Sequence, residues 1–137
     1  MNNDCLFCKM IAGEIPTNKV FEDENVLAFL DIRPVNPGHV LVIPKKHDAD
    51  LLAMDDETAA AWINGVRKVA AAVKKGMGVE GFNLNVNTGA VAGQVVFHVH
   101  AHIMPRNGRD EYHLWRGAPY ASDEEAAGIA KRIRDAF

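Results

Sequence analysis

The chain has 137 residues, of which 48% are hydrophobic and 24% are charged, and its formal net charge is −3 at pH 7. The length suits one domain over residues 1–137, and the small net charge gives no reason to expect nucleic acid or a membrane surface as partner. No apolar run reaches the roughly 20 residues that cross a membrane, and the N-terminus lacks a signal-peptide pattern, so we expect a cytoplasmic protein.

The first part of the chain predicts a short helix and two paired strands. The helix covers residues 5–12, and the apolar stretches VLAFLDI and GHVLVIP predict strands at 26–32 and 38–44. Between the strands, RPVNPG is rich in the residues that form turns, which is typical of a hairpin with a longer loop.

A long helix of about 20 residues is predicted next, because apolar residues recur there at helical spacing. Asp55 or Asp56 is suited to the N-cap, and Gly76 or Gly78 is suited to the end of the helix. The apolar stripe consists of Trp62, Val66, Val69 and Val73.

Two strands of mixed character follow. In the first, 82–89, apolar residues alternate with asparagines, and in the second, 95–104, histidines occupy positions 98, 100 and 102. Side chains alternate between the faces of a strand, so each strand has a polar face and an apolar face that we expect to lie in the core. The expected polar residues are Asn83, Asn85, Asn87, His98, His100 and His102, and the expected core residues are Phe82, Leu84, Val86, Phe97, Val99, Ala101 and Ile103.

The last predicted element is a helix that begins near Ser122. Ser122 and Glu125 have the spacing of a capping box, and Ile129 and Ile133 give the helix an apolar edge. A run of strands with one long helix among them predicts an α+β fold with an antiparallel sheet.

Three histidines at two-residue spacing are compatible with a metal site, a catalytic array or an unusually polar core. Two histidines at i and i+2 can bind zinc, although the carboxylate that often completes such a site is missing from this strand. Catalysis needs a neutral imidazole nitrogen aimed at an electrophile, a group that orients the ring, and donors for developing charge. The histidines, the asparagines and the Gly-rich loop 89–93 include such groups for a phosphoryl centre, and both interpretations stay open.

The only two cysteines, Cys5 and Cys8, form a C-x-x-C pair. In a reducing compartment such a pair is a redox motif, half of a metal site, or two unrelated thiols. A redox motif normally opens a helix after a central strand, whereas this pair lies near the N-terminus. We therefore favour half of a zinc site, which requires two further ligands.

Three stretches together resemble the histidine triad (HIT) family. GQVVFHVHAHIMPR is similar to the pattern His-φ-His-φ-His-φ-φ, in which φ is apolar and Ala101 is the weakest match. FLDIRPVNPGHVLVIPKKH resembles the upstream signature of the family, and CLFCKMIAGEIPTNKVFEDE resembles its bacterial N-terminus. The resemblance implies a homodimer whose α+β chains each hold a five-stranded antiparallel sheet, continuous across the dimer, with one long helix and shorter terminal helices.

The resemblance also implies a hydrolase that acts on the α-phosphate of purine nucleoside phosphoramidates. His100 matches the nucleophile, which would hold the nucleoside monophosphate as a covalent intermediate. His102 and His39 match groups that contact the phosphate, and His98 lies beside the nucleophile. A dinucleoside polyphosphate hydrolase, a nucleotide-binding protein with little turnover, and a metalloenzyme with all three histidines on one metal are the alternatives.

Further residues are assigned by the same resemblance. Asp31 matches a ribose-binding acid, with a strand-end turn residue as the alternative, while Asn87 and Gln94 match amides that bind the phosphate or leaving group. The positions that match the base pocket, each of which could equally be core, are Phe7, Met10, Ile15, Phe29 and Ile32.

Zinc-binding bacterial members of the family suggest the missing metal ligands. By resemblance, Cys5, Cys8, His47 and His98 would hold one structural zinc ion per chain, with free thiols as the alternative. Val95 departs from the family pattern, because related phosphoramidases carry a hydroxyl residue there, and this leaves the preferred substrate open. His113 and Trp115 lie beyond the matched region and receive no role from the sequence.

Overall fold

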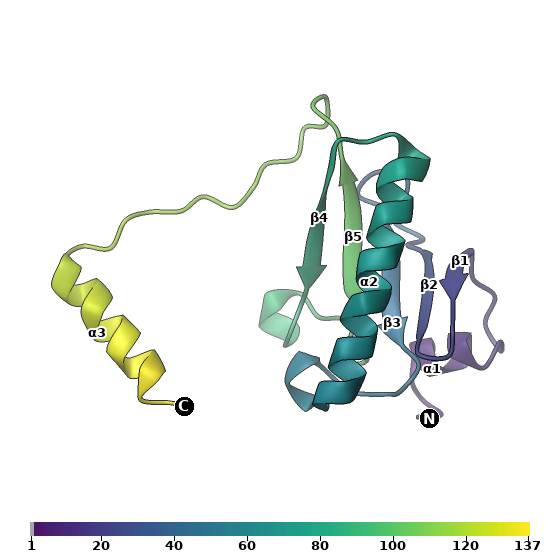
Figure 1. Cartoon of the computed structure of the whole chain (residues 1–137), viewed down its shortest axis with the longest axis horizontal. Coiled ribbons are helices and arrows are strands. Elements are labelled where there is room, and N and C mark those ends of the chain that lie inside the picture. The colour runs from purple at the N-terminus through teal and green to yellow at the C-terminus, as the bar shows by residue number, and fades with distance from the viewer. Residues whose placement is uncertain (1) are drawn as a thin grey trace.

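The computed structural model describes residues 2–137 and contains one sheet of five antiparallel strands in the order β1-β2-β3-β5-β4 (Figure 1). The strands are β1 (Lys19–Glu22), β2 (Val26–Leu30), β3 (Val40–Pro44), β4 (Gly81–Val86) and β5 (Ala101–Arg106), and the helices are α1 (Leu6–Ile11), α2 (Asp56–Met77) and α3 (Asp123–Arg134). Two short 3-10 turns are η1 (Leu51–Ala53) and η2 (Ala90–Ala92). The predicted α+β fold, with one long helix and shorter terminal helices, is confirmed.

Helix α2 begins and ends at residues that the sequence predicts. The carboxylate of Asp55 accepts a hydrogen bond from the backbone N–H of Thr58 at 2.7 Å, and Gly78 ends the helix in the left-handed conformation, with φ of 63°. The predicted stripe of α2 is buried against the sheet, where the indole N–H of Trp62 donates to the carbonyl of Val42 at 3.0 Å. This contact satisfies the one polar atom of the Trp62 ring within the core.

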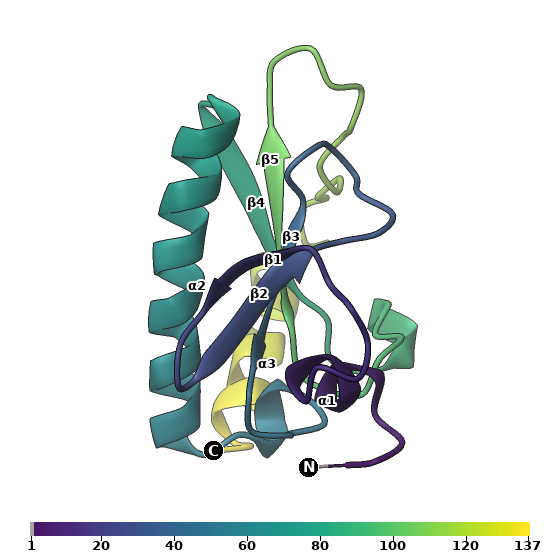
Figure 2. The same cartoon turned by 90° about the vertical axis from the view of Figure 1, so that its right-hand side faces the viewer.

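The two faces of the sheet are covered by different helices. Figure 2 shows α2 along one face, while α1 lies across the other. The face beneath α2 carries alternate residues of β2 and β3, such as Ala28 and Val42, and the opposite face carries their neighbours Phe29 and Leu41. The predicted hairpin is confirmed, since β2 pairs with β3 in antiparallel register. Strand β1 was not predicted, because it is a short, mostly exposed edge strand without alternation.

The strand that carries the histidines begins later than predicted. Strand β5 starts at Ala101, so His98 and His100 lie in an irregular segment before it and only His102 lies on the strand. In this segment the N–H of Val99 donates to the carbonyl of Asp48, a loop residue, at 2.8 Å. The prediction that Phe97 lies in the core is wrong, since 52% of Phe97 is exposed, whereas Val99, Ala101 and Ile103 are buried.

The apolar face of β4 is only partly covered. Phe82 and Leu84 are 38% and 42% exposed, although both were expected in the core. Leu84 pairs with Ile103, so it lies on the α2 side of the sheet, but β4 is the edge strand and only Val86 there packs against the core. The strand ends at Val86, so Asn87 lies just beyond it.

Helix α3 lies apart from the sheet at the end of an extended segment (Figure 1). The predicted N-cap is confirmed, because the Ser122 hydroxyl accepts from the N–H of Glu125, while the Glu125 carboxylate accepts from the N–H of Ala121, one residue before the N-cap. Ile133 on its apolar edge is 60% exposed. The single domain over residues 1–137 stays a prediction. Within residues 2–137, no helix combines the length and the apolar character needed to span a bilayer.

The close approach of α2 to the sheet depends on Gly65, and a paired substitution tests it. A Cβ at Gly65 would lie 2.8 Å from a methyl of Val26, whereas a Cβ at Gly76 of the same helix meets nothing within 4 Å. We expect Gly65→Ala to destabilise the fold by about 1–3 kcal/mol through overpacking. Gly76→Ala should stabilise it by about 0.5–1 kcal/mol through helix propensity. Urea unfolding of both variants measures the difference, and equal effects would contradict this packing.

Candidate functional site

A cavity of about 700 Å³ opens on the face of the sheet that carries α1. It is bounded by α1, by β2 and the residues after it, and by the segment that leads to the histidines. Of the residues assigned to a nucleotide site, those that line it are Phe7, Met10, Phe29, Asp31, Ile32 and His100. Ile15 is not among the lining residues. These residues give the cavity an apolar floor with one carboxylate and one imidazole, and the cationic Arg33 also lines it.

The proton of His100 is placed by a backbone carbonyl. Its Nδ1 lies 2.8 Å from the carbonyl oxygen of His98, and because a carbonyl can only accept, Nδ1 carries the hydrogen. Burial lowers the pKa of His100, so its imidazole is neutral at pH 7 and keeps a lone pair on Nε2. His100 thus presents an unprotonated nitrogen at the wall of the cavity.

His39 and His102 form a directed chain of hydrogen bonds. The N–H of Val35 donates to Nδ1 of His39 at 3.1 Å, so the His39 proton is on Nε2, which lies 2.9 Å from Nδ1 of His102. His102 accepts that bond and therefore carries its own proton on Nε2. Burial, together with the neighbouring imidazoles, lowers the pKa of His102 to about 4. The chain ends in a neutral N–H donor.

Asp31 follows β2 and lies beside His39, the first histidine in this series of hydrogen bonds. One carboxylate oxygen accepts from the N–H of Arg33 at 2.8 Å, and the other lies 3.7 Å from Nε2 of His39. Asp31 thus has the turn contact expected of a strand-end residue, and it also lines the cavity.

The amide of Gln94 is occupied by the protein itself. Its oxygen accepts from the N–H of Gly89, and its nitrogen donates to the carbonyls of Ala49 and Val96. Gln94 is buried and closes the loop 89–93. Its predicted contact with a nucleotide stays a prediction, as does that of Asn87, whose amide lies 3.4 Å from the carbonyl of Gly93. Val95 is 85% exposed and lines the same cavity as His100.

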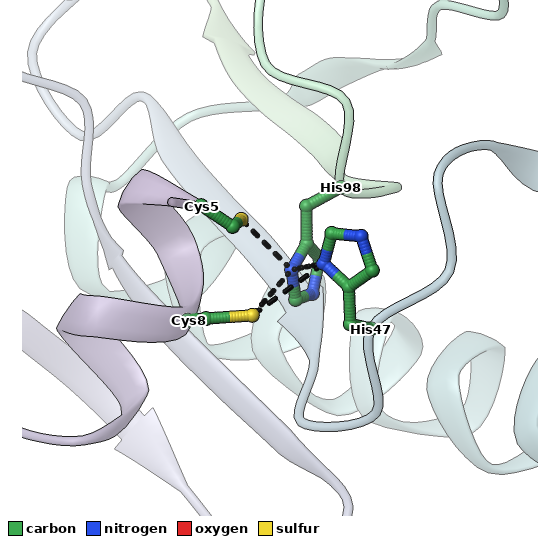
Figure 3. A group of neighbouring side chains, drawn as sticks. All are labelled: Cys5, Cys8, His47 and His98. Atoms are coloured by element: carbon green, nitrogen blue, oxygen red, sulfur yellow. Dashed lines mark hydrogen bonds between the residues drawn. The ribbon is translucent and has the colours of Figure 1, made fainter. Parts of the chain in front are cut away.

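Cys5, Cys8, His47 and His98 converge on one point beside the cavity (Figure 3). Nδ1 of His98 lies 3.5 Å and 3.7 Å from the two sulfurs and 3.2 Å from Nδ1 of His47, which itself lies 3.4 Å from the Cys8 sulfur. Bond lengths at tetrahedral zinc place two nitrogens about 3.3 Å apart, and a nitrogen and a sulfur about 3.6 Å apart.

The proton of His98 is also directed away from this cluster. Its Nε2 lies 2.8 Å from the carbonyl of Pro44 and donates to it, so Nδ1 keeps a lone pair toward the sulfurs. Burial raises the pKa of the Cys8 thiol, so a cation is the partner that would stabilise its thiolate. The donor set and its spacing fit a four-coordinate metal ion.

The cluster and the nucleophile candidate share two structural links. The backbone carbonyl of His98 accepts from His100, and Phe7, between the two cysteines, packs edge-on against the His100 ring at 5.2 Å between centroids. The three rings of the histidine run have different partners: the cysteine cluster for His98, a carbonyl for His100 and His39 for His102. This arrangement gives no support to one metal held by all three.

Comparison with known families agrees with this geometry. The HIT domain profile matches residues 12–109. The chain belongs to the HIT family. Among curated relatives of this HIT protein, the adenosine 5'-monophosphoramidase hnt1 of Schizosaccharomyces pombe is 42% identical over 131 residues, covering 94% of this chain and 95% of that protein. The adenylylsulfatase HINT3 of Arabidopsis thaliana is 42% identical over 139 residues, covering 98% of this chain and 70% of that protein.

Solved structures extend the likeness over nearly the whole HIT protein. A HIT family member from Bacillus subtilis, 42% identical, aligns over 98% of both chains with a TM-score of 0.91. A Zn-bound histidine triad family protein from Mycobacterium smegmatis, 35% identical, also covers 98% of both chains, with a TM-score of 0.76.

Several residues of the site were not predicted. Val35 orients His39 through its backbone N–H, and a backbone contact leaves no side-chain signal in a sequence. Leu41 lines the cavity, and its position opposite Phe29 in the hairpin register is a signal that would have identified it. Thr17 and Asn18 also line the cavity; they lie in the N-terminal stretch that resembles the family, but that resemblance assigned them no role.

The lowered pKa of His102 gives a direct test of the buried hydrogen bonds that link Val35, His39 and His102. We expect His102 to remain neutral from pH 7 down to pH 5 and to take up a proton only near pH 4, because burial disfavours the charged ring. NMR of labelled imidazoles follows this proton, with His102→Gln to assign the signal. A pKa near 6.5, the value of a free imidazole, would contradict the burial of His102.

Proposed function

We propose that this HIT protein hydrolyses the phosphorus–nitrogen bond of purine nucleoside 5'-phosphoramidates, as an adenosine 5'-monophosphoramidase does. The observation that carries the proposal is the protonation of His100, which leaves Nε2 free at the wall of a nucleotide-sized cavity. The name of the phosphoramidase relative from S. pombe supports the same substrate class.

The reaction proceeds in two displacements at one phosphorus. The lone pair of His100 Nε2 attacks the α-phosphorus, the bond from phosphorus to the amine nitrogen breaks, and the departing amine takes up a proton. A water molecule then attacks the phosphorus of the nucleotidyl-His100 intermediate, releases a proton and restores free His100. His102 donates from Nε2 to a phosphoryl oxygen, and His39 holds His102 in that tautomer.

The nucleoside occupies the 700 Å³ cavity. Phe7, Met10, Phe29 and Ile32 line its apolar part and would enclose the base, while the Asp31 carboxylate, at its edge, would accept from the ribose hydroxyls. We place Asn87 and Gln94 at the phosphate end of the site, Asn87 through its exposed amide and Gln94 through the loop that it closes. Ile15 directly precedes the lining residue Pro16 but does not line the cavity itself, so we do not place it against the base.

A dinucleoside polyphosphate hydrolase is the second candidate, because it would use the same nucleophile and the same nucleoside cavity. The relatives named phosphoramidase and adenylylsulfatase differ in leaving group. Membership of the family therefore does not fix the leaving group, which an experiment must determine. A binding protein with little turnover is the third candidate, and the free Nε2 of His100 is the observation against it.

We propose that Cys5, Cys8, His47 and His98 hold one structural Zn²⁺ ion per chain. The spacing of the four donor atoms and the Zn-bound relative from M. smegmatis support this assignment. The zinc would tie α1 to the segment before β5 and fix the carbonyl of His98 that orients His100. All four positions are filled by protein atoms, so the ion would take no direct part in the reaction.

We further propose a homodimer whose sheet continues across two chains at β4. β4 ends the strand order, and its exposed Phe82 and Leu84 supply apolar surface at that edge.

Sedimentation equilibrium tests the dimer. The wild-type protein should have twice the mass of one chain, and the Leu84→Arg variant should have the mass of one chain.

Loss of the nucleophile gives the main test of the reaction. We expect wild-type protein to form an adenylyl adduct from adenosine 5'-phosphoramidate in a single turnover, visible by intact-mass spectrometry. In His100→Ala the adduct should be absent and turnover should fall by about three orders of magnitude or more. Phe97→Ala is the matched control, since this exposed residue is three positions before His100 in the chain and does not line the cavity. Normal turnover in His100→Ala would refute the mechanism.

Zinc is tested by metal analysis of the purified protein. We expect one equivalent in the wild type and less than a tenth of that in the Cys5→Ser/Cys8→Ser variant, because two of four ligands are lost. His39→Ala should retain the full equivalent of zinc. His39 is hydrogen-bonded to His102 and is not one of the four residues Cys5, Cys8, His47 and His98. Full zinc in the double variant would exclude the assignment.

A further inference from the structure

The two cysteines are placed so that they can bond to each other as well as to a metal. Cys5 is the N-cap residue of α1 and Cys8 is the third residue of this helix. Residues three positions apart in a helix have Cα atoms about 5 Å apart on the same side, a separation that a disulfide can span. The two sulfurs lie within 4.8 Å of each other (Figure 3). Since the chain has no other cysteine, each thiol has one possible disulfide partner within the molecule.

The surroundings of the pair match a redox motif more closely than the sequence indicates. Such a motif normally opens a helix after a central strand, and the position of the pair near the N-terminus argues against it. In the fold the pair does open a helix, α1, and it is buried with Leu41 and Ile43 of β3, the central strand of the sheet. Packing thus brings the pair, its helix and a central strand together, although chain order does not.

A small oxidant can reach the pair through a cavity that is separate from the proposed nucleoside site. This cavity has a volume of about 210 Å³ and shares no lining residue with the 700 Å³ cavity. One water molecule takes about 30 Å³ in the liquid, so hydrogen peroxide has room to enter. Because Cys5 and Cys8 are only 8% and 3% exposed, the route favours a hydroperoxide over another protein as oxidant. The lining residues are Asn2, Asn3, Cys8, Lys9, Ala12 and Glu14.

We propose that Cys5 and Cys8 are a redox-reactive dithiol, which a hydroperoxide converts to a disulfide with loss of the bound zinc. This inference rests on the proposed zinc site. One thiolate attacks a peroxide oxygen, the O–O bond breaks, and a cysteine sulfenic acid and hydroxide form. The second thiolate attacks the sulfenic sulfur, the S–O bond breaks, and a second hydroxide leaves. Two electrons pass from the sulfurs to the peroxide, and two protons from solvent convert the hydroxides to water.

Loss of zinc follows from the charge and number of the remaining donors. The thiolate, and not an oxidised sulfur, is the form of cysteine that binds a metal, so the disulfide removes two of the four donors and both of their negative charges. Nδ1 of His47 and Nδ1 of His98 would be left. Structural zinc is held by four protein ligands, and two neutral imidazoles would not retain it.

The dithiol is linked to the 700 Å³ cavity by the helix that carries it. Phe7 lies between the two cysteines in the chain and lines that cavity, with its ring 5.6 Å from the ring of Phe29 and 5.2 Å from that of His100. Once the sulfurs pair with each other, the tie from α1 to His98 is lost. The wall that Phe7 forms is then less firmly held, so oxidation should weaken nucleotide binding.

Peroxide treatment of the full-length protein, purified under reducing conditions, tests the dithiol. We expect each chain to lose the mass of two hydrogen atoms and to release one zinc ion at the same rate, followed by mass spectrometry and a chromogenic zinc chelator. Dithiothreitol should restore the mass. Addition of oxygen atoms at the cysteines, or no change of mass there, would overturn the proposal. If the disulfide forms in a protein that carried no zinc, the dithiol is supported and the zinc assignment fails.

Two variants separate the thiol chemistry from the metal. Cys8→Ser has a single thiol, so the loss of two hydrogen atoms should be absent. His47→Ala lacks one proposed ligand but keeps both thiols, and it should still form the disulfide, since the pairing needs only the first turn of α1. Because mass is read on the peptide that contains residues 5–8, the result holds even where a variant binds no zinc. Loss of two hydrogen atoms in Cys8→Ser would assign the oxidation elsewhere and refute the pair.

Binding of adenosine 5'-monophosphate, followed by calorimetry, tests the link to the nucleoside site. We expect Kd to rise several-fold on oxidation of the wild type, and to return after reduction and addition of zinc. In Cys5→Ser/Cys8→Ser the same peroxide treatment should leave Kd unchanged, whatever its starting value. An equal Kd for the oxidised and reduced wild type would refute the link. If the reduced protein binds no nucleotide, the proposed function fails, whereas the mass of the peptide still decides the dithiol.

Discussion

The hydrogen bond from Nδ1 of His100 to the carbonyl of His98 is the interaction on which the site depends. A carbonyl oxygen only accepts, so this bond decides which ring nitrogen carries the proton and which remains free for an electrophile. The same residue that provides the carbonyl turns its own ring the other way, toward two cysteines and His47. Backbone and side chain of His98 therefore serve two different centres.

Similar assignments of protons recur throughout the site. A carbonyl fixes the proton of His98, a backbone N–H fixes that of His39, and His39 in turn fixes that of His102. In each case the partner belongs to the rigid frame of the sheet or to the loop 31–39. Burial lowers the pKa of these imidazoles, so the site holds neutral rings whose directions are set before a ligand arrives.

The sequence predicted the elements whose signals are local. Helix α2 was predicted because Asp55, Gly78 and the apolar stripe each mark it independently, and the hairpin of β2 and β3 was predicted from its turn residues. The directions of the histidines could not be predicted from two-residue spacing, because that period assumes a regular strand and the backbone is irregular before Ala101. The Cys/His cluster needed the resemblance to a family, since its members come from three separate segments.

The irregular backbone at His98–His100 has a consequence for protein design. A seven-residue histidine motif grafted onto a regular strand would place all three rings on one face with parallel orientations. In this HIT protein the rings point to three different partners because only the last one is on the strand. The transferable unit is therefore the motif together with the carbonyls of Pro44 and His98, the loop of Val35 and the break that precedes β5. Copying the spacing alone would give three parallel imidazoles on one strand, suited to binding a metal, rather than three imidazoles with different partners.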